Sequence, residues 1–417
     1  MNSTYLPKRR KIINDPVYGF ITLRHAFILE LIDHPWYQRL RRITQLGLSH
    51  LVYPGATHNR FQHAIGAMHL MQIAIDEIRL KGHEITSEEE VGLLAAVLLH
   101  DVGHGPFSHA LEFSIVDGLH HEDISSIMME KLNQYFNGQL TLAIEIFNNR
   151  YHKKFLHQLV SSQLDMDRLD YLARDSFFSG VVEGQVGSER ILKMLDVVDD
   201  QLVVEEKGIY SIEKFIVARR FMYWQVYLHK TVLSAEFMLV NVLKRAKKLA
   251  TNGVELFGSP ALKYFLYNSV TKENFSSDNQ SLIHYADLDD FDITGAVKVW
   301  QNHSDKVLST LSRNIIGRNL FKIELQKEPF DKAIVSKKLA ATAEAFNLTQ
   351  EEAGYFVLSQ TVDNRAYNLE DDGIKILMKS GEVKDAAVVS DHLNLAALSQ
   401  SVYKYFLAYP RFFCKSI

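Results

Sequence analysis

The sequence predicts a mainly helical protein with a mixed α+β region towards its C-terminus. Apolar residues recur at helical spacing over His63–Ile78 and again over Ile124–Phe136. The acidic run Ser87–Glu90 precedes the apolar segment Val91–Leu99, which is typical of the start of a buried helix. Ile209–Asn252 contains neither glycine nor proline. This segment predicts one very long helix or two joined tightly, either buried in the core or packed against a second subunit.

Strand signals are few. Gln201–Glu205, with Gly208 between the arms, predicts a short hairpin. Ile374–Met378 and Val383–Val389 flank a polar turn and predict a clearer hairpin near residues 374–389. The strands are therefore expected to be short and secondary to the helices.

Length and composition limit the class of protein. A chain of 417 residues is large for one compact core, so we expect a helical lobe over residues 1–250 and a mixed lobe over residues 251–417. The net charge of −4 argues against a nucleic-acid partner. The single cysteine, Cys414, excludes a disulfide or a thiolate metal site within one chain. No apolar run is long enough to span a bilayer, so we expect a soluble cytoplasmic protein.

Three histidines and two acids crowd into LLHDVGHGPFSHALE, which runs from Leu98 to Glu112. His100 and Asp101 follow the predicted buried helix, where both side chains can turn toward one ion, and His104 comes one helical turn later. Imidazole nitrogen and carboxylate oxygen together suit Mn, Fe or Zn. The alternative is that these residues are helix caps and core histidines.

Two ligands leave an ion under-coordinated, so further ligands are needed. His63 lies at the start of a predicted helix, and Asp167 lies within the motif LDMDRLDYLARD. Two histidines and two aspartates would leave coordination positions for water and a phosphate oxygen. The sequence has no glycine-rich phosphate loop and no serine or cysteine nucleophile motif. Phosphate chemistry would therefore depend on metal, histidine and arginine.

Several motifs occur in a fixed order over residues 11–180: KIINDPVYG, QRLRRITQLGL, YPGATHNRFQHAIG, LLHDVGHGPFSH, HHEDIS and DMDRLDYLARDS. Weaker similarity continues through RRFMYWQVYLHK. In this order the motifs resemble the HD-domain phosphohydrolase superfamily, and more closely its deoxynucleoside triphosphate triphosphohydrolase branch, which includes the SAM-and-HD-domain proteins. The resemblance implies a helical HD-domain metallohydrolase core.

The resemblance also implies roles for the histidines and acids. One divalent ion (Mn, Fe, Ni or Zn) would be held by His63, His100, Asp101 and Asp167, and Mg would accompany the substrate triphosphate. The catalytic residues would be His104, His109, His121 and Glu112. His109 would be the acid that serves the 5′-oxygen leaving group. The alternative for His104 and His109 is a supporting role around the metal. Glu112 stands where a relative has an aspartate.

A substrate pocket is implied as well, formed by Arg60, Gln45, Leu46, Arg168, Tyr171, Asp175, Arg219 and Tyr227. The arginines would contact phosphates, although a plain salt bridge is the alternative for Arg60. Gln45 and Leu46 would line the sugar, and Asp175 would lie towards its 3′-hydroxyl. Tyr227 would close against C2′, where a ribose hydroxyl would clash.

The family's guanine-nucleotide activator region, which lies between subunits in relatives, is matched by Lys11, Asn14, Asp33, Gln38 and Arg41. The segment DQLVVEEKG has acids where a relative has a basic nucleotide-contacting residue, so this activator site would be incomplete. We expect a homodimer or homotetramer whose activity responds to a second nucleotide.

These inferences predict a metal-dependent enzyme that splits deoxynucleoside triphosphates into deoxynucleoside and inorganic triphosphate. One alternative keeps the metal site but acts as a phosphodiesterase or nucleotide monophosphatase, which does not need the sugar-lining residues. A second alternative is a nucleotide-sensing protein whose catalysis is vestigial. Free triphosphate as the product would distinguish the first of these from the others.

Overall fold

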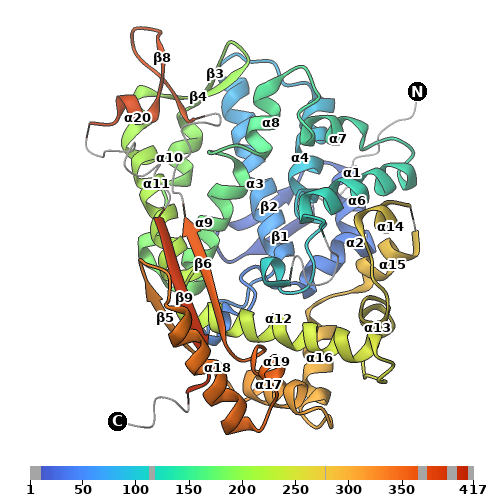
Figure 1. Ribbon diagram of the computed structural model, residues 1–417. Helices are drawn as coiled ribbons and strands as arrows, with labels where there is room; N and C mark the ends of the chain where they lie inside the picture. The colour runs from blue at the N-terminus through green and yellow to red at the C-terminus, as the bar shows by residue number, and fades with distance from the viewer. Residues whose placement is uncertain (1–10, 112–117, 278, 365–372, 392–401, 412–417) are drawn as a thin grey trace.

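The computed structural model describes residues 11–111, 118–277, 279–364, 373–391 and 402–411. Within these ranges helices dominate, and the strands form three small sheets (Figure 1). The predicted mainly helical architecture, with a mixed C-terminal region, is confirmed.

The N-terminal helices pack around α3, which contacts both α4 and α9 (Figure 1). Their bounds are α1 (Ala26–Asp33), α2 (Pro35–Gln38), α3 (Arg60–Leu80), α4 (Ser87–Leu99), α6 (His121–Tyr135), α7 (Thr141–Phe147), α8 (Lys154–Val160), α9 (Met166–Ser179) and α10 (Ser188–Lys193). Short 3₁₀ turns connect them: η1 (Arg39–Arg42), η2 (Ser49–Leu51), η3 (Ser108–Leu111), η4 (Val182–Gly184) and η5 (Glu206–Gly208).

Both α3 and α4 begin with a capping box. The Asn59 side chain accepts a hydrogen bond from the Gln62 backbone N–H, and Thr86 accepts one from Glu89. In each case the third residue returns a hydrogen bond to the cap, which satisfies two otherwise unpaired backbone donors. α4 ends at Leu99, directly before the predicted metal ligands.

The first described residues form a hairpin that was not among those predicted. β1 (Lys11–Asp15) pairs antiparallel with β2 (Gly19–Leu23). Asp15 closes the turn by accepting hydrogen bonds from the backbone N–H groups of Val17 and Tyr18. The hairpin therefore ends in a fixed carboxylate, whose second oxygen remains for another partner.

The hairpin expected at Gln201–Glu205 exists, but the predicted turn is wrong. β3 (Leu195–Val198) pairs with β4 (Gln201–Glu205) through Asp199 and Asp200. Both aspartates have positive φ angles, 49° and 62°, which fit a tight two-residue hairpin turn. Gly208 instead ends η5, where the next helix starts.

The C-terminal hairpin extends the same sheet. β7 (Lys375–Leu377) pairs antiparallel with β8 (Val383–Asp385), where the sequence predicts a hairpin. The expected extension of its second arm is wrong, because Ala386–Val389 forms the short helix α20, which the Asp385 side chain caps. β7 also pairs in parallel with β4, which gives the strand order β3-β4-β7-β8.

The segment without glycine or proline forms two helices joined tightly. α11 (Ile209–Met222) runs into a π-helical turn, η6 (Tyr223–Tyr227), and α12 (Lys230–Thr251) starts after a bend of 56°. The His229 side chain caps α12 by accepting a hydrogen bond from the Thr231 backbone N–H. Within the described ranges no single helix is long and apolar enough to cross a membrane, and only this bent pair meets the criteria of length and composition together.

Later elements pack against α12 (Figure 1). The helices are α13 (Pro260–Tyr267), α14 (Lys272–Ser277), α15 (Asn279–Asp287), α16 (Asp290–Trp300), α17 (Lys306–Ile316), α18 (Lys332–Phe346) and α19 (Gln350–Ala353). In the third sheet, β9 (Val402–Tyr409) lies between β5 (Lys322–Gln326) and β6 (Leu358–Asn364), antiparallel to both. One hydrophobic cluster contains residues from both expected lobes, from Ile21 to Ala408.

Candidate active site

The four predicted metal ligands come from three helix ends. His63 lies near the start of α3, and Asp167 lies in the first turn of α9. His100 and Asp101 directly follow α4. Asp165 caps α9 by accepting a hydrogen bond from a backbone N–H, which sets the position of the turn that carries Asp167. Because α3 packs against both α4 and α9, the three helix ends meet.

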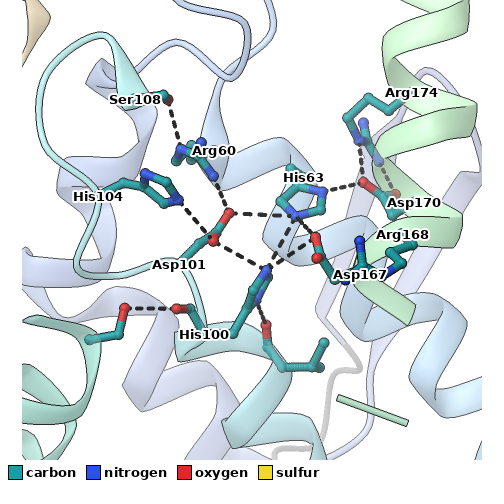
Figure 2. A network of polar contacts seen from close by, with 12 residues as sticks. Arg60, His63, His100, Asp101, His104, Ser108, Asp167, Arg168, Asp170 and Arg174 are labelled. Atoms are coloured by element: carbon teal, nitrogen blue, oxygen red, sulfur yellow. Dashed lines mark hydrogen bonds and ion pairs between the residues drawn. The ribbon is translucent and has the colours of Figure 1, made fainter. Parts of the chain in front are cut away.

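Their donor atoms converge (Figure 2), and those of His63, His100 and Asp101 all lie within 4.8 Å of one another. The Nε2 atoms of His63 and His100 are 3.4 Å apart, and both face one oxygen of Asp167, at 3.0 and 3.4 Å. Asp101 places one carboxylate oxygen 3.6 Å from His63 Nε2 and the other 3.4 Å from His100 Nε2. Ligands about 2.0–2.2 Å from one ion are separated from each other by distances of this size. The four residues therefore fit a single divalent ion.

The far nitrogen of each histidine ring is already engaged (Figure 2). His100 Nδ1 lies 2.6 Å from the carbonyl oxygen of Val97, which can only accept, so Nδ1 carries the proton. His63 Nδ1 lies 2.7 Å from a carboxylate oxygen of Asp170. Both contacts leave the Nε2 lone pair directed at the point where the donor atoms converge, which is the tautomer that a metal requires.

Charge is concentrated at this cluster. Burial lowers the pKa of His63, but hydrogen bonds with Asp167 and Asp170 outweigh burial and raise that pKa to about 10. Burial raises the pKa of Asp167, but hydrogen bonds with His100 and His63 outweigh burial and hold it well below its usual range. The carboxylates thus favour a positive charge among them, and a divalent cation supplies that charge while taking neutral imidazole ligands.

Arg60 occupies the other side of Asp101. Its guanidinium pairs with one carboxylate oxygen of Asp101, and its Nε donates to Ser108 Oγ, 2.8 Å away. Burial raises the pKa of Asp101, but the charge of Arg60 outweighs burial and keeps this pKa well below its usual range. The structure therefore shows the salt bridge considered for Arg60, whereas its contact with a phosphate stays a prediction.

Two of the predicted catalytic residues lie beside the ligands. His104 Nε2 is 3.2 Å from Asp101 Oδ1, and the His104 ring stacks on His121 with centroids 3.8 Å apart. Burial and the positive charge of Arg60 lower the pKa of His104 well below its usual range. The His104 ring is therefore neutral at neutral pH. Glu112 and the side chain of His109 lie outside the described residues.

A cavity of 360 Å³ opens onto the cluster and is lined by His100, Asp101 and Asp167 among others. Arg168 lines the same cavity, and its Nε donates to the carbonyl oxygen of Ser162, 2.6 Å away. A guanidinium thus lies next to the predicted metal position, where it would neutralise a phosphate group.

Four more predicted substrate residues form a connected group. The Tyr227 hydroxyl donates to Asp175, 2.7 Å away, and the Tyr227 ring lies edge-on to Tyr171. Burial raises the pKa of Tyr171, and the charges of Arg219 and Arg168 oppose that rise. Both arginines therefore lie within electrostatic range of this ring. The structure thus brings Arg168, Tyr171, Asp175, Arg219 and Tyr227 together.

Two polar atoms of the predicted substrate residues, Arg219 Nε and Gln45 Oε1, are buried and have no hydrogen-bond partner within the described part of the chain. Buried polar groups are nearly always paired, so each indicates a position for a ligand atom or an ordered water. An arginine N–H suits a phosphate oxygen, and an amide oxygen suits a hydroxyl. Leu46, the second predicted sugar residue, is partly buried against the core.

His58 was not among the predicted site residues. Its Nε2 lies 2.7 Å from Asp175 Oδ1, and its ring stacks on Phe178 with centroids 4.5 Å apart. His58 thereby holds the carboxylate that Tyr227 also contacts. Its position in the motif YPGATHNRF was the sequence feature that could have indicated a role in the site.

Asp290, at the start of α16, is a second residue that the sequence did not indicate. It accepts hydrogen bonds from the backbone N–H groups of Thr44, at 2.9 Å, and Phe107, at 2.6 Å. Phe107 and Ser108 both have φ of 55°, a costly conformation for residues with side chains, which persists only where the surroundings enforce it. Asp290 thus holds the loop that carries Ser108 against Arg60.

All five residues of the predicted activator region line a second cavity, of 220 Å³: Lys11, Asn14, Asp33, Gln38 and Arg41. Lys11 pairs with Asp33 at 3.7 Å, and Arg41 donates to Gln38 at 2.8 Å. The Arg41 guanidinium also lies 3.5 Å from the ring centroid of Phe61. The structure gathers these residues, and a nucleotide between them stays a prediction.

Two family models match regions of the chain that contain the predicted metal ligands and several of the predicted substrate residues. Residues 60–175 match the HD domain family, and residues 186–256 match the HD associated region. The uncharacterized protein YwfO of Bacillus subtilis is 32% identical over 393 residues, which are 90% of this chain and 86% of that protein. The crystal structure of a phosphohydrolase from Bacteroides thetaiotaomicron is 54% identical, with a TM-score of 0.94, and the match covers 97% of this chain and 100% of that one.

A nucleotide hydrolase is also among the similar proteins. The deoxynucleoside triphosphate triphosphohydrolase SAMHD1 homolog of Dictyostelium discoideum is 34% identical over 259 residues, which are 57% of this chain and 50% of that protein. The match therefore spans half of that relative's length. The four predicted metal ligands all fall within the HD domain match.

Proposed function

We propose that this chain, which belongs to the SAMHD1-like branch of the HD-domain phosphohydrolases, hydrolyses deoxynucleoside triphosphates. The reaction consumes one water and releases a deoxynucleoside and inorganic triphosphate. Membership of the family makes the chain a phosphohydrolase, and the substrate and the bond that breaks are our proposal.

The observation that carries this proposal is that Arg219 Nε and Gln45 Oε1 are buried without a hydrogen-bond partner among the described residues. Leaving a buried donor or acceptor unpaired costs about 1–3 kcal/mol, so a substrate that satisfies both atoms binds with a corresponding advantage. A deoxynucleoside triphosphate offers phosphate oxygens to the arginine and a sugar hydroxyl to the amide. Inorganic phosphate or polyphosphate offers nothing to the sugar-lining residues.

The chain's own residues account for the phosphate chemistry. His63, His100, Asp101 and Asp167 would hold a divalent ion, which supplies an acidified water and polarises an α-phosphate oxygen. Arg168 and Arg219 neutralise the phosphate chain, whose charge otherwise repels the attacking oxygen. The new bond forms at the α-phosphorus, the bond to the 5′-oxygen breaks, and that oxygen takes a proton, for which His109 is the proposed donor.

Chromatography of the products tests this proposal. The protein is incubated with dGTP and Mn²⁺, and we expect equal amounts of deoxyguanosine and inorganic triphosphate. Release of dGMP with pyrophosphate, or of dGDP with phosphate, would contradict it. Turnover confined to phosphodiesters or nucleoside monophosphates would support the phosphodiesterase or monophosphatase alternative, and retained metal without any turnover would support a sensor.

We further propose that the 220 Å³ cavity binds a regulatory nucleotide and that the chain assembles as a homodimer or homotetramer. Lys11 and Arg41 provide cationic groups in that cavity, and the adjoining hairpin exposes 55% of Ile12 and 74% of Phe20. These two side chains are available to pack against a second subunit. Light scattering over a dilution series, with and without dGTP or dATP, tests the assembly, and a monomer with full activity at every concentration would refute it.

A further inference from the structure

We propose that Asp15 and Arg174 are positioning residues for the metal centre, which act through Asp170 on His63. These four side chains form a continuous line of charged hydrogen bonds from the β1–β2 hairpin to the ring of a predicted metal ligand. This inference rests on the proposed function only in taking His63 as a ligand, and its test needs no substrate.

Each link of the line has hydrogen-bond geometry. His63 Nδ1 lies 2.7 Å from Asp170 Oδ2. Arg174 binds both oxygens of Asp170, with its Nε 2.9 Å from Oδ2 and its Nη2 3.0 Å from Oδ1. The remaining nitrogen, Nη1, donates to Asp15 Oδ2 at 2.8 Å. Figure 2 shows Arg174 reaching from α9 to the side of Asp170 that faces away from the metal ligands.

The line is buried along its whole length. The side chains of His63, Asp170 and Arg174 are 0% exposed, and that of Asp15 is 3% exposed. At such sites water screens charges weakly, so each group depends on its partners. Gly66 of α3 makes room for the line, because a Cβ there would lie 2.0 Å from Asp170 Oδ1 and 2.1 Å from Arg174 Nη2.

The charge of Asp15 controls how strongly the Arg174 guanidinium attracts the Asp170 carboxylate. With Asp15 ionised, the guanidinium is shared between two carboxylates, and Asp170 remains a strong acceptor for the Nδ1 proton of His63. This hydrogen bond orients the ring and makes Nε2 a better ligand. A neutral side chain at position 15 leaves Arg174 to Asp170 alone and removes one negative charge from the line. Both effects weaken metal binding.

The competing explanation is that the line only anchors the hairpin to the core. Asp15 also closes its own turn through Oδ1, and an asparagine keeps this function because its amide oxygen accepts the same hydrogen bonds. Anchoring predicts that Asp15→Asn changes the unfolding temperature and leaves the metal affinity of the folded protein unchanged. Positioning predicts that the affinity falls.

The test is Mn²⁺ affinity, measured on the full chain by competition with a chromogenic chelator. Glu90→Gln is the matched control, because Glu90 is also a buried carboxylate paired with an arginine, Arg79 at 2.5 Å, but it lies on α4 away from this line. We expect Asp15→Asn to bind Mn²⁺ about 10-fold more weakly and Glu90→Gln to bind it as the wild type does.

A second variant keeps the test decisive if Asp15→Asn does not fold. Arg174→Lys retains the charge but cannot bind Asp170 and Asp15 through a planar fork, so it should also bind Mn²⁺ more weakly. Wild-type affinity in either folded variant overturns the proposal, and so does an equal loss in Glu90→Gln. The measurement contains no nucleotide, so a failure to hydrolyse dGTP refutes the proposed function and leaves this inference standing.

Discussion

At the scale of residues, the site depends on which donor and acceptor atoms already have hydrogen-bond partners within the protein. The Nδ1 atoms of His63 and His100 have protein partners, so their Nε2 atoms remain for an ion. The Asp101 carboxylate is crowded, because it contacts Arg60 and His104 in addition to the rings of His63 and His100. Changes at Asp101 therefore affect metal binding and folding together.

Asp101→Asn should lose the bound metal and nearly all turnover, because an amide supplies no negative charge to the ion. It should also lose about 3 kcal/mol of stability, since Arg60 is only 3% exposed and would keep a buried charge without its partner. Metal analysis after dialysis and chemical denaturation measure the two losses. Asp123→Asn, on the wall of the same cavity, should show neither. A variant that keeps metal and rate would remove Asp101 from the site.

Tyr227→Ala should reduce the preference for dGTP over GTP by about 10-fold or more, because a ring against C2′ excludes the ribose hydroxyl sterically. Tyr227→Phe is the matched control, since it keeps the ring and loses only the hydrogen bond to Asp175. The ratio of kcat/KM for the two nucleotides is the measurement. An unchanged ratio in Tyr227→Ala would place the sugar wall elsewhere.

At the scale of elements, local patterns predict helices well and predict their breaks poorly. Apolar spacing and acidic first turns are local signals, so α3, α4 and the histidines and aspartate at their ends could be placed from the sequence. The π-helical turn Tyr223–Tyr227 carries no glycine or proline, and the capping residue His229 was the only local signal of the bend. The turn of the β3–β4 hairpin was misplaced because aspartates, and not Gly208, adopt its positive φ angles.

Glu90→Gln should destabilise the fold at neutral pH and have little effect in acid. A hydrogen bond from His25 and another from Arg79 outweigh burial and lower the Glu90 pKa to about 2. The folded pKa is below the unfolded value of about 4.3, so this stabilisation is complete above that value and disappears as pH falls towards 2. Denaturant unfolding of both proteins at several pH values measures the difference. A difference that persists unchanged down to pH 3 would contradict this account.

At the scale of the whole molecule, the site depends on contacts between distant parts of the chain. Asp290 holds Thr44 and Phe107, and Asp15 meets Arg174. No periodicity or motif spacing encodes such pairs, because only the folded core brings them together. For this reason the clustering of His63, His100, Asp101 and Asp167 could be predicted from motifs, whereas the residues that hold them in place could not.

Asp290→Asn should leave the metal content unchanged and lower kcat/KM for dGTP by about 10–100-fold, because small misplacements near reacting groups are costly. An asparagine at this position turns its NH₂ group toward one of the two backbone donors, and the loops at Thr44 and Phe107 lose their common anchor. Asp287→Asn, which is exposed near the same helix start, is the control. Wild-type kinetics in Asp290→Asn would show that the site does not depend on this contact.

Hydrolysis of dGTP in H₂¹⁸O tests the central claim most directly, because the position of the label identifies the bond that breaks. If water attacks the α-phosphorus and the metal cluster supports that attack, mass spectrometry will show one ¹⁸O in inorganic triphosphate and none in deoxyguanosine. The label should fail to appear in any product when a chelator removes the metal. Label in the deoxyguanosine hydroxyl, or products of monophosphate and pyrophosphate, would contradict the account.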